Sequence, residues 1–231
     1  MTQALKHRLP DPRDTDIVFC TSKEGLAVIG KPDTELAIWE RTLPFCLQSW
    51  LNQLDAAFLP DFRTLVDPRD VRRAIVPHMD NCGMPSGDMR ELLVSDIEDL
   101  VSAFAGITGS DLVDIRLERV DHDACWKFHR DCVEARLLTT YRGLATEWVH
   151  RDNETQALQN QKNYDGPLEQ FQSNDVAIFK GSCAGPGSGV VHRSPPIAGT
   201  GHTRLLLCLN KRSMTSPEPW PADDRQETGR S

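Results

Sequence analysis

Three residues of this chain have the types and the spacing of a mononuclear iron site: His129, Asp131 and His192. Two imidazoles and one carboxylate bind Fe(II) on one face and leave the other face open for a second substrate and oxygen. Residues two apart in an extended strand point the same way, so His129 and Asp131 can reach one metal together. His192 would come from a strand distant in sequence. The pattern therefore predicts one metal centre built from two segments.

The pattern His-x-Asp is weak evidence by itself, because it occurs three times: His78/Asp80, His129/Asp131 and His150/Asp152. His78 precedes a turn-like stretch, and His150 leads into a polar segment, 153–172, without a strand period. Only the middle pair is followed at once by a strand-like run, 133–141, which would hold the ligands rigidly. We therefore place the site at the middle pair and interpret His78 and His150 as surface or turn histidines.

Arg204 begins the next apolar run along the chain, which continues as Leu205, Leu206 and Leu207. Alternation along a strand would place Arg204 on the face opposite Leu205 and Leu207. Its planar guanidinium could hold a dicarboxylate co-substrate through two parallel hydrogen bonds. The other interpretation is a strand-end arginine paired with a surface carboxylate.

The composition indicates a single soluble domain over residues 1–231, with 39% hydrophobic and 26% charged residues. No apolar run approaches the roughly 20 residues that span a bilayer. The polar start of the chain, Met1 to Asp16, lacks the apolar core of a secretory signal. We therefore expect a cytoplasmic protein with no membrane partner. The net charge of −8 argues against broad nucleic-acid binding.

The seven cysteines are scattered, without a Cys-x-x-Cys pair, as is typical of reduced thiols rather than of a disulfide framework. Cys125 and Cys132 nevertheless bracket His129, which leaves a zinc-binding Cys/His site open. A thiolate pair at this place would bind zinc more tightly than iron. Zinc is therefore the alternative metal.

The periodicity predicts a helical part, about residues 33–106, followed by a β part, about residues 110–211. One helix, capped by Asp33, would run through Leu36 and Trp39, and a second would begin at Pro44. The clearest helix would begin with the capping box of Asp88 and Glu91, and Gly106 and Gly109 would close it.

The expected strands cover residues 112 or 113–120, 135–141, 176–179, 189–192 and 205–209. Helices followed by many short strands predict an α+β, mainly β, fold: a double-stranded β-helix (jelly roll) with an N-terminal helical layer. The polar, proline-containing segment 213–231 is expected to be a disordered tail.

Two families share features with this chain. Its segments 128–131, 136–143, 191–196 and 204–207 resemble a bacterial family, domain of unknown function 1826, and this resemblance covers most of the chain. The layout of residues 112–210 also resembles the Fe(II)/2-oxoglutarate dioxygenases, which use His-x-Asp, a distal His and a later Arg inside a jelly roll. The second resemblance implies metal ligands at His129, Asp131 and His192. It also implies that Arg204 binds the distal carboxylate of 2-oxoglutarate.

Tyr141 lies on the strand after the ligand pair, and under this resemblance its hydroxyl would donate to the same carboxylate. A core aromatic residue is the other interpretation. The resemblance implies an Fe(II)- and 2-oxoglutarate-dependent oxygenase that hydroxylates an unknown small-molecule or peptide substrate. Two alternatives stay open: a non-redox zinc-binding protein for storage, delivery or sensing, and a cupin-like metalloenzyme without 2-oxoglutarate.

Overall fold

The computed structural model describes residues 16–221, and ten strands form two sheets in them. The strands are β1 (Ile17–Cys20), β2 (Leu36–Trp39), β3 (Phe62–Val66), β4 (Val113–Val120), β5 (Ala135–Arg142), β6 (Glu147–Trp148), β7 (Glu169–Gln170), β8 (Val176–Lys180), β9 (His192–Arg193) and β10 (Arg204–Lys211). The large sheet has the order β1-β2-β8-β5-β10-β4-β3, and the small one β7-β6-β9. Neighbouring strands are antiparallel except β1 and β2, which are parallel.

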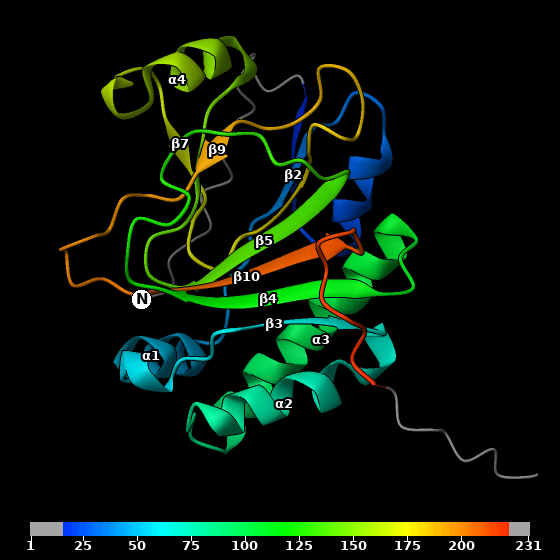
Figure 1. The fold of residues 1–231 in the computed structure, drawn as a ribbon, viewed down its shortest axis with the longest axis vertical. Coiled ribbons are helices and arrows are strands. Elements are labelled where there is room, and N and C mark those ends of the chain that lie inside the picture. Colours follow the sequence, from blue (N-terminus) through cyan, green and yellow to red (C-terminus); the bar gives the residue numbers. More distant parts are fainter. Residues whose placement is uncertain (1–15, 222–231) are drawn as a thin grey trace, which may run out of the picture.

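The helices lie on both sides of the large sheet (Figure 1). They are α1 (Phe45–Gln53), α2 (Val71–Asn81), α3 (Asp88–Thr108) and α4 (Glu154–Asn160), with short 3-10 turns at Glu24–Gly30, Ala56–Phe58, Pro68–Asp70, Arg151–Asn153 and Gln161–Asn163. Helices α1, α2 and α3 cover one face, whereas α4 and the small sheet lie over the other (Figure 1). Within residues 16–221, no helix combines the length and the apolar character that crossing a membrane requires.

Strand β10 shows how the large sheet divides the interior. Leu205, Leu207 and Leu209 belong to the main core, which includes the apolar stripe of α3. Leu206 and Cys208 belong to a second apolar cluster, which includes side chains of the small sheet. Successive side chains of a strand point to opposite faces, so the sheet has a helix-covered face and an inner face.

Two of the three expected helices are confirmed. Helix α3 begins at Asp88 and ends at Thr108, where Gly109 takes the left-handed conformation with φ +63°. Helix α1 follows Pro44 as expected. The expected helix through Leu36 and Trp39 is wrong, because this segment is strand β2, paired on both sides with β1 and β8. Helix α2 was not expected.

The expected strands at 113–120, 135–141, 176–179 and 205–209 are confirmed as β4, β5, β8 and β10. The expected strand 189–192 is reduced to His192–Arg193, because the preceding residues form a loop. Strands β2 and β3 lie in the part that was expected to be helical, and β1 precedes it. The described chain is therefore mostly sheet, with a large, mainly antiparallel sheet and helices against it.

The segment after Ser213, expected to be disordered, is partly held against the large sheet. Pro219 forms a parallel bridge with Leu65 of β3, and the backbone N–H of Trp220 donates to the Leu65 carbonyl at 2.7 Å. The ring of Trp220 also lies 5.2 Å from the guanidinium of Arg73. Residues 222–231 of the expected tail lie outside the described residues.

Candidate metal centre

The structure brings together the three residues proposed as metal ligands. His129, Asp131 and His192 each offer one ligand atom, and these atoms lie within 4.8 Å of one another. The Nε2 atom of His129 is 3.5 Å from Oδ1 of Asp131, and Nε2 of His192 is 3.3 Å from Oδ2. The group is the one candidate metal cluster found among residues 16–221.

Both histidine rings are oriented by backbone carbonyls. Nδ1 of His129 lies 2.8 Å from the carbonyl oxygen of Lys127, and Nδ1 of His192 lies 3.0 Å from that of Val190. A carbonyl only accepts hydrogen bonds, so each Nδ1 carries a proton and donates it. In a neutral ring, Nε2 then keeps its lone pair and points toward the carboxylate. This is the tautomer that coordination through Nε2 requires.

A backbone bridge fixes the two histidines opposite each other. The N–H of His129 donates to the carbonyl of His192 at 3.0 Å, and the N–H of His192 donates back at 3.1 Å. His192 also pairs with Trp148 of the small sheet. The distance between the two imidazole ligands is therefore set by main-chain hydrogen bonds and does not depend on a metal.

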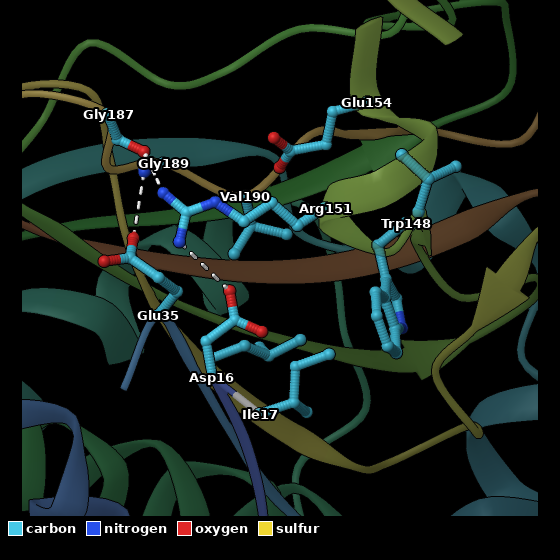
Figure 2. Close-up of a pocket in the computed structure, with 11 residues that line it drawn as sticks. Asp16, Ile17, Glu35, Trp148, Arg151, Glu154, Gly187, Gly189 and Val190 are labelled. Carbon is cyan, nitrogen blue, oxygen red and sulfur yellow. Dashed lines mark hydrogen bonds and ion pairs between the residues drawn. The ribbon is translucent and has the colours of Figure 1, made fainter. Parts of the chain in front are cut away.

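The loop that leads to the second histidine is also fixed by side chains. The carboxylate of Glu35 accepts from the N–H of Gly189 at 3.0 Å, and Nη2 of Arg151 donates to the carbonyl of Gly187 at 3.0 Å. Figure 2 shows Arg151 between this carbonyl and Asp16, whose carboxylate lies 3.8 Å away. These side-chain contacts hold the glycine-rich loop in place, although the loop is not part of a strand.

Arg136 of β5 is a further residue of the site. Its Nη1 atom lies 2.7 Å from Oδ2 of Asp131, and its Nε donates to Asn210 at 2.7 Å. Burial raises the pKa of Asp131, but hydrogen bonds from His129 and His192 in their protonated forms and the charge of Arg136 outweigh it and hold the pKa well below its usual range. The carboxylate therefore stays ionised, as metal binding requires. The sequence offered one signal for Arg136, a charged residue directly before the apolar pair Leu137 and Leu138.

A cavity of about 260 Å³ adjoins the ligands on the inner face of the large sheet. His129, His192 and Arg136 line it, together with inner-face side chains of β4, β5 and β10. Arg116 and Glu118 of β4 add one charge of each sign, 3.6 Å apart. The cavity therefore offers a polar, metal-proximal space for small molecules.

Arg204 is fully buried on the inner face, as alternation predicted. Its Nη2 makes a long contact of 3.4 Å with Oγ1 of Thr146, which lines the cavity. In the described part of the chain, its Nε and Nη1 atoms have no hydrogen-bond partner. Burial lowers the pKa of Arg204 to about 10, so the guanidinium is still charged at neutral pH. A buried cation without a counter-ion is costly, and an anionic ligand would neutralise it.

Tyr141 does not join the site. Its side chain belongs to the main core with Leu137, on the helix-covered face, whereas Leu138 lines the cavity. Its hydroxyl donates to Oδ2 of Asp96 in α3 at 2.6 Å. The expectation that Tyr141 shares a cavity with Arg204 is therefore wrong, because alternation along β5 directs its side chain away. Thr146, which no sequence signal marked, lies beside Arg204 instead.

The histidines of the other two His-x-Asp pairs, His78 and His150, pack against aromatic side chains away from the site. His78 lies in α2 with its ring stacked on Phe62 at 4.5 Å. His150 is buried beside Trp148, with ring centroids 4.9 Å apart, and Nε2 lies 3.5 Å from Glu169. Neither belongs to the metal cluster, but the interpretation of His150 as a surface or turn residue is wrong because its side chain is buried.

The cysteines near the first histidine do not form a zinc site with it. Cys125 and Cys132 are both exposed, and neither belongs to the candidate metal cluster of the described residues. The thiol of Cys132 instead contacts that of Cys183. The donor set is therefore two imidazoles and a carboxylate, without thiolate.

Comparisons with known proteins give one family and several weak structural likenesses. No curated protein matches the chain. A Pseudomonas putida prolyl-4-hydroxylase is 13% identical, with TM-score 0.41, covering 81% of this chain and 99% of that one. AviO1 from Streptomyces viridochromogenes Tue57 is 14% identical, with TM-score 0.35, over 81% and 93%. The carbocyclase SnoK, described as non-heme and alpha ketoglutarate dependent, is 9% identical, with TM-score 0.34, over 82% and 84%.

Because these TM-scores are low, the structural likenesses support no conclusion about activity. The family match is of a different kind. The family described as "Protein of unknown function (DUF1826)" matches residues 21–210, which is well over half of the chain. This protein is therefore a member of the DUF1826 family.

Proposed function

We propose that this protein is an Fe(II)- and 2-oxoglutarate-dependent oxygenase that hydroxylates a C–H bond of its substrate. The observation that carries the proposal is Arg204, a buried cation whose Nε and Nη1 atoms have no hydrogen-bond partner among residues 16–221. Its neighbour Thr146 lines a cavity that is also lined by His129 and His192 of the His/Asp/His group. We also infer that the large and small sheets are the two halves of a double-stranded β-helix. The ligands then lie between the halves, where the small sheet meets the cavity.

The donor set fits Fe(II). Both Nε2 atoms are free of protons in the neutral rings, and the Asp131 carboxylate is held ionised. Two imidazoles and one carboxylate on one side leave the side toward the cavity for further ligands. When bound with a keto acid and oxygen, the metal supplies the oxidising chemistry. Arg136 keeps the carboxylate of Asp131 in place through its contact at 2.7 Å.

Arg204 is suited to the distal carboxylate of 2-oxoglutarate. Its Nε and Nη1 atoms are unused, and two parallel N–H donors match a carboxylate. The Thr146 hydroxyl, 3.4 Å from Nη2, supplies a further polar group on the cavity wall. Because burial strengthens the attraction between the two charges, Arg204 would orient the keto acid with its reactive end toward the ligands.

The cavity limits the substrate. Its volume of about 260 Å³ is at the small end for ligand pockets, which favours a small molecule or one protruding side chain of a peptide. Arg116, Arg119 and Glu118 on β4 line it and provide donors and an acceptor. We therefore expect a compact substrate with polar groups.

The test is an anaerobic titration of the full chain with Fe(II) and 2-oxoglutarate, followed by visible absorption. We expect the charge-transfer band of a keto acid bound through two oxygens. Arg204→Met should weaken 2-oxoglutarate binding by ~10-fold or more, because charge-assisted hydrogen bonds are lost, while Fe(II) binding is unchanged. Arg204→Lys should recover part of the loss, since lysine keeps the positive charge but lacks the two parallel N–H donors of the guanidinium.

Arg116→Met is the matched control, because it removes an arginine that lines the cavity itself. It should leave the affinity for 2-oxoglutarate unchanged. If Fe(II) binds but 2-oxoglutarate produces no band, the keto-acid proposal is wrong and a metalloenzyme without 2-oxoglutarate becomes the better description. If the Arg116 variant loses the band and the Arg204 variant keeps it, the co-substrate anchor is misassigned.

A further inference from the structure

Two exposed thiols meet beside the metal centre. The Sγ atoms of Cys132 and Cys183 lie 3.3 Å apart, and both residues are exposed. Cys132 directly follows the ligand Asp131, and Cys183 lies in the loop after β8. A disulfide has an S–S distance of about 2.05 Å, so a small side-chain movement would suffice to form one. We propose that Cys132 and Cys183 are a redox site that forms a reversible disulfide and thereby fixes the loop carrying Asp131.

The backbones of the two loops are already joined. The carbonyl of Asp131 accepts from the N–H of Ser182 at 2.8 Å and from its hydroxyl at 3.1 Å. The N–H of Cys183 donates to the carbonyl of Val133 at 3.1 Å. A Cβ atom at Gly181 would lie only 2.3 Å from that carbonyl oxygen. The sequence therefore places glycine where the backbones touch, and the thiols meet without help from a metal.

Forming the Cys132–Cys183 disulfide requires an oxidant. We propose that this oxidant is a low-molecular-weight disulfide such as oxidised glutathione. One thiol of the pair, as thiolate, attacks a sulfur of the small disulfide, and one small thiolate leaves. The second thiol of the pair then attacks the mixed disulfide and displaces the other small thiolate. The two cysteines lose two electrons and two protons, and the small disulfide becomes two thiols. Both steps are accessible because both sulfurs are exposed.

The bond would act on metal retention through Asp131. In the reduced protein, hydrogen bonds alone join the two loops, and they can open together with the ligand. A covalent link restricts that movement, so the carboxylate stays close to its histidine partners. Pre-organised ligands release a metal more slowly. This consequence rests on the metal site of the proposed function, whereas the disulfide itself does not.

The first experiment asks whether the bond forms. The full chain, treated with a chelator to remove metal, is incubated with excess oxidised glutathione and measured by intact mass and thiol titration. We expect Cys132 and Cys183 of the parent together to lose two hydrogens and two free thiols, without a lasting glutathione adduct on either residue. Cys132→Ser and Cys183→Ser should each prevent this change. Cys125→Ser is the matched control, since it removes another exposed thiol and should behave as the parent.

Stable glutathione adducts on Cys132 and Cys183, or thiols that stay reduced, would overturn the proposal.

The second experiment measures the release of Co(II) to a competing chelator from the oxidised and the reduced protein. Release should be about threefold slower or more after oxidation. The serine variants should show one rate under both conditions. Equal rates in the parent would overturn the link to the metal. If Co(II) does not bind in either state, the metal site of the proposed function is wrong, and the mass result still decides the disulfide.

Discussion

Arg41 and Arg204 are two nearly inaccessible arginines on opposite faces of the large sheet. Among residues 16–221, only Arg41 has a carboxylate as an ion-pair partner. Arg41 binds Asp96 of α3 through both terminal nitrogens, at 2.5 and 2.9 Å, and its Nε donates to the carbonyl of Asn174 at 2.8 Å. Burial lowers the pKa of Arg41, but the contacts with Asp96 outweigh it and raise the pKa. The pKa of Arg204 is lowered instead.

The difference separates a face whose buried polar groups are paired from the face on which we propose that a ligand binds. On the helix-covered face, the buried hydroxyl of Tyr141 and the guanidinium of Arg41 both use Asp96. On the inner face, Arg204 has donors that the described chain does not satisfy. Natural proteins leave few buried polar groups unpaired, so such a group points to a missing ligand. Four predictions, based on changes to single residues or to pH, test this contrast.

The largest effect is expected at the metal centre. His192→Ala removes one of the two imidazoles, and it should abolish stoichiometric binding of Fe(II) or Co(II) while the chain stays folded. The loss should exceed the ~10–100-fold that follows removal of a group that merely supports a ligand. Calorimetric titration under anaerobic conditions measures it. His78→Ala is the control and should bind as the parent does. Retained one-to-one binding by the His192 variant would contradict the assignment.

The two arginines should differ in their contribution to stability. Arg41→Met leaves Asp96 without its cation, so the free energy of unfolding should fall by about 3–5 kcal/mol. Arg204→Met removes a buried charge that lacks a carboxylate partner, so the free energy of unfolding should stay constant or rise. Urea unfolding without added ligands compares the two variants. Equal destabilisation would mean that Arg204 has a structural partner comparable to Asp96.

Tyr141 tests the boundary between the faces. Tyr141→Phe removes the hydrogen bond from its hydroxyl to Asp96, and it should lower the free energy of unfolding by about 1.5–3 kcal/mol because the acceptor is charged. The affinity for 2-oxoglutarate should be that of the parent. Urea unfolding and keto-acid titration of the same preparation measure both quantities. Weaker keto-acid binding with unchanged stability would place Tyr141 in the site after all.

The smallest effect concerns pH. The hydrogen bond to Asp131 raises the pKa of His129, although burial opposes it. A metal needs the neutral ring, and a raised pKa means that the proton is held to higher pH than in a free histidine. Metal affinity should therefore fall as the pH drops through this raised pKa, by up to ~10-fold per pH unit for one proton. Competition titrations at several pH values measure it. An affinity that is independent of pH would contradict proton competition at His129.

The sequence predicted the site best where the type of a residue could be combined with the alternation of side chains along a strand. His-x-Asp before a strand-like run placed two ligands, and alternation put Arg204 on the face opposite Leu205 and Leu207, as the structure has it. The same reasoning failed for Tyr141. The run Leu137-Leu138 is apolar on both faces, so the pattern does not indicate which face the helices cover.

Strand β2 was missed for a related reason. Leu36, Ala37 and Ile38 are all buried, and a short continuous apolar run cannot be assigned to helix or strand by its period. The loop before His192 has no period either, and side chains far away in sequence, such as Glu35, hold it. Thr146 is similar, since its role follows from its proximity to Arg204, which only the folded chain shows.

Under the proposed function, the reciprocal backbone bridge between His129 and His192 has a consequence for how the protein would acquire its metal. Because main-chain hydrogen bonds set the spacing of these ligands, the centre can be assembled before an ion arrives. Folding on the ribosome then does not have to wait for iron, and an empty chain is not a misfolded one. The fraction of loaded protein is expected to follow the supply of metal in the cell rather than the rate of synthesis. If iron is the metal, as proposed, a cell could thus keep a reserve of folded, empty protein and fill it when iron becomes available.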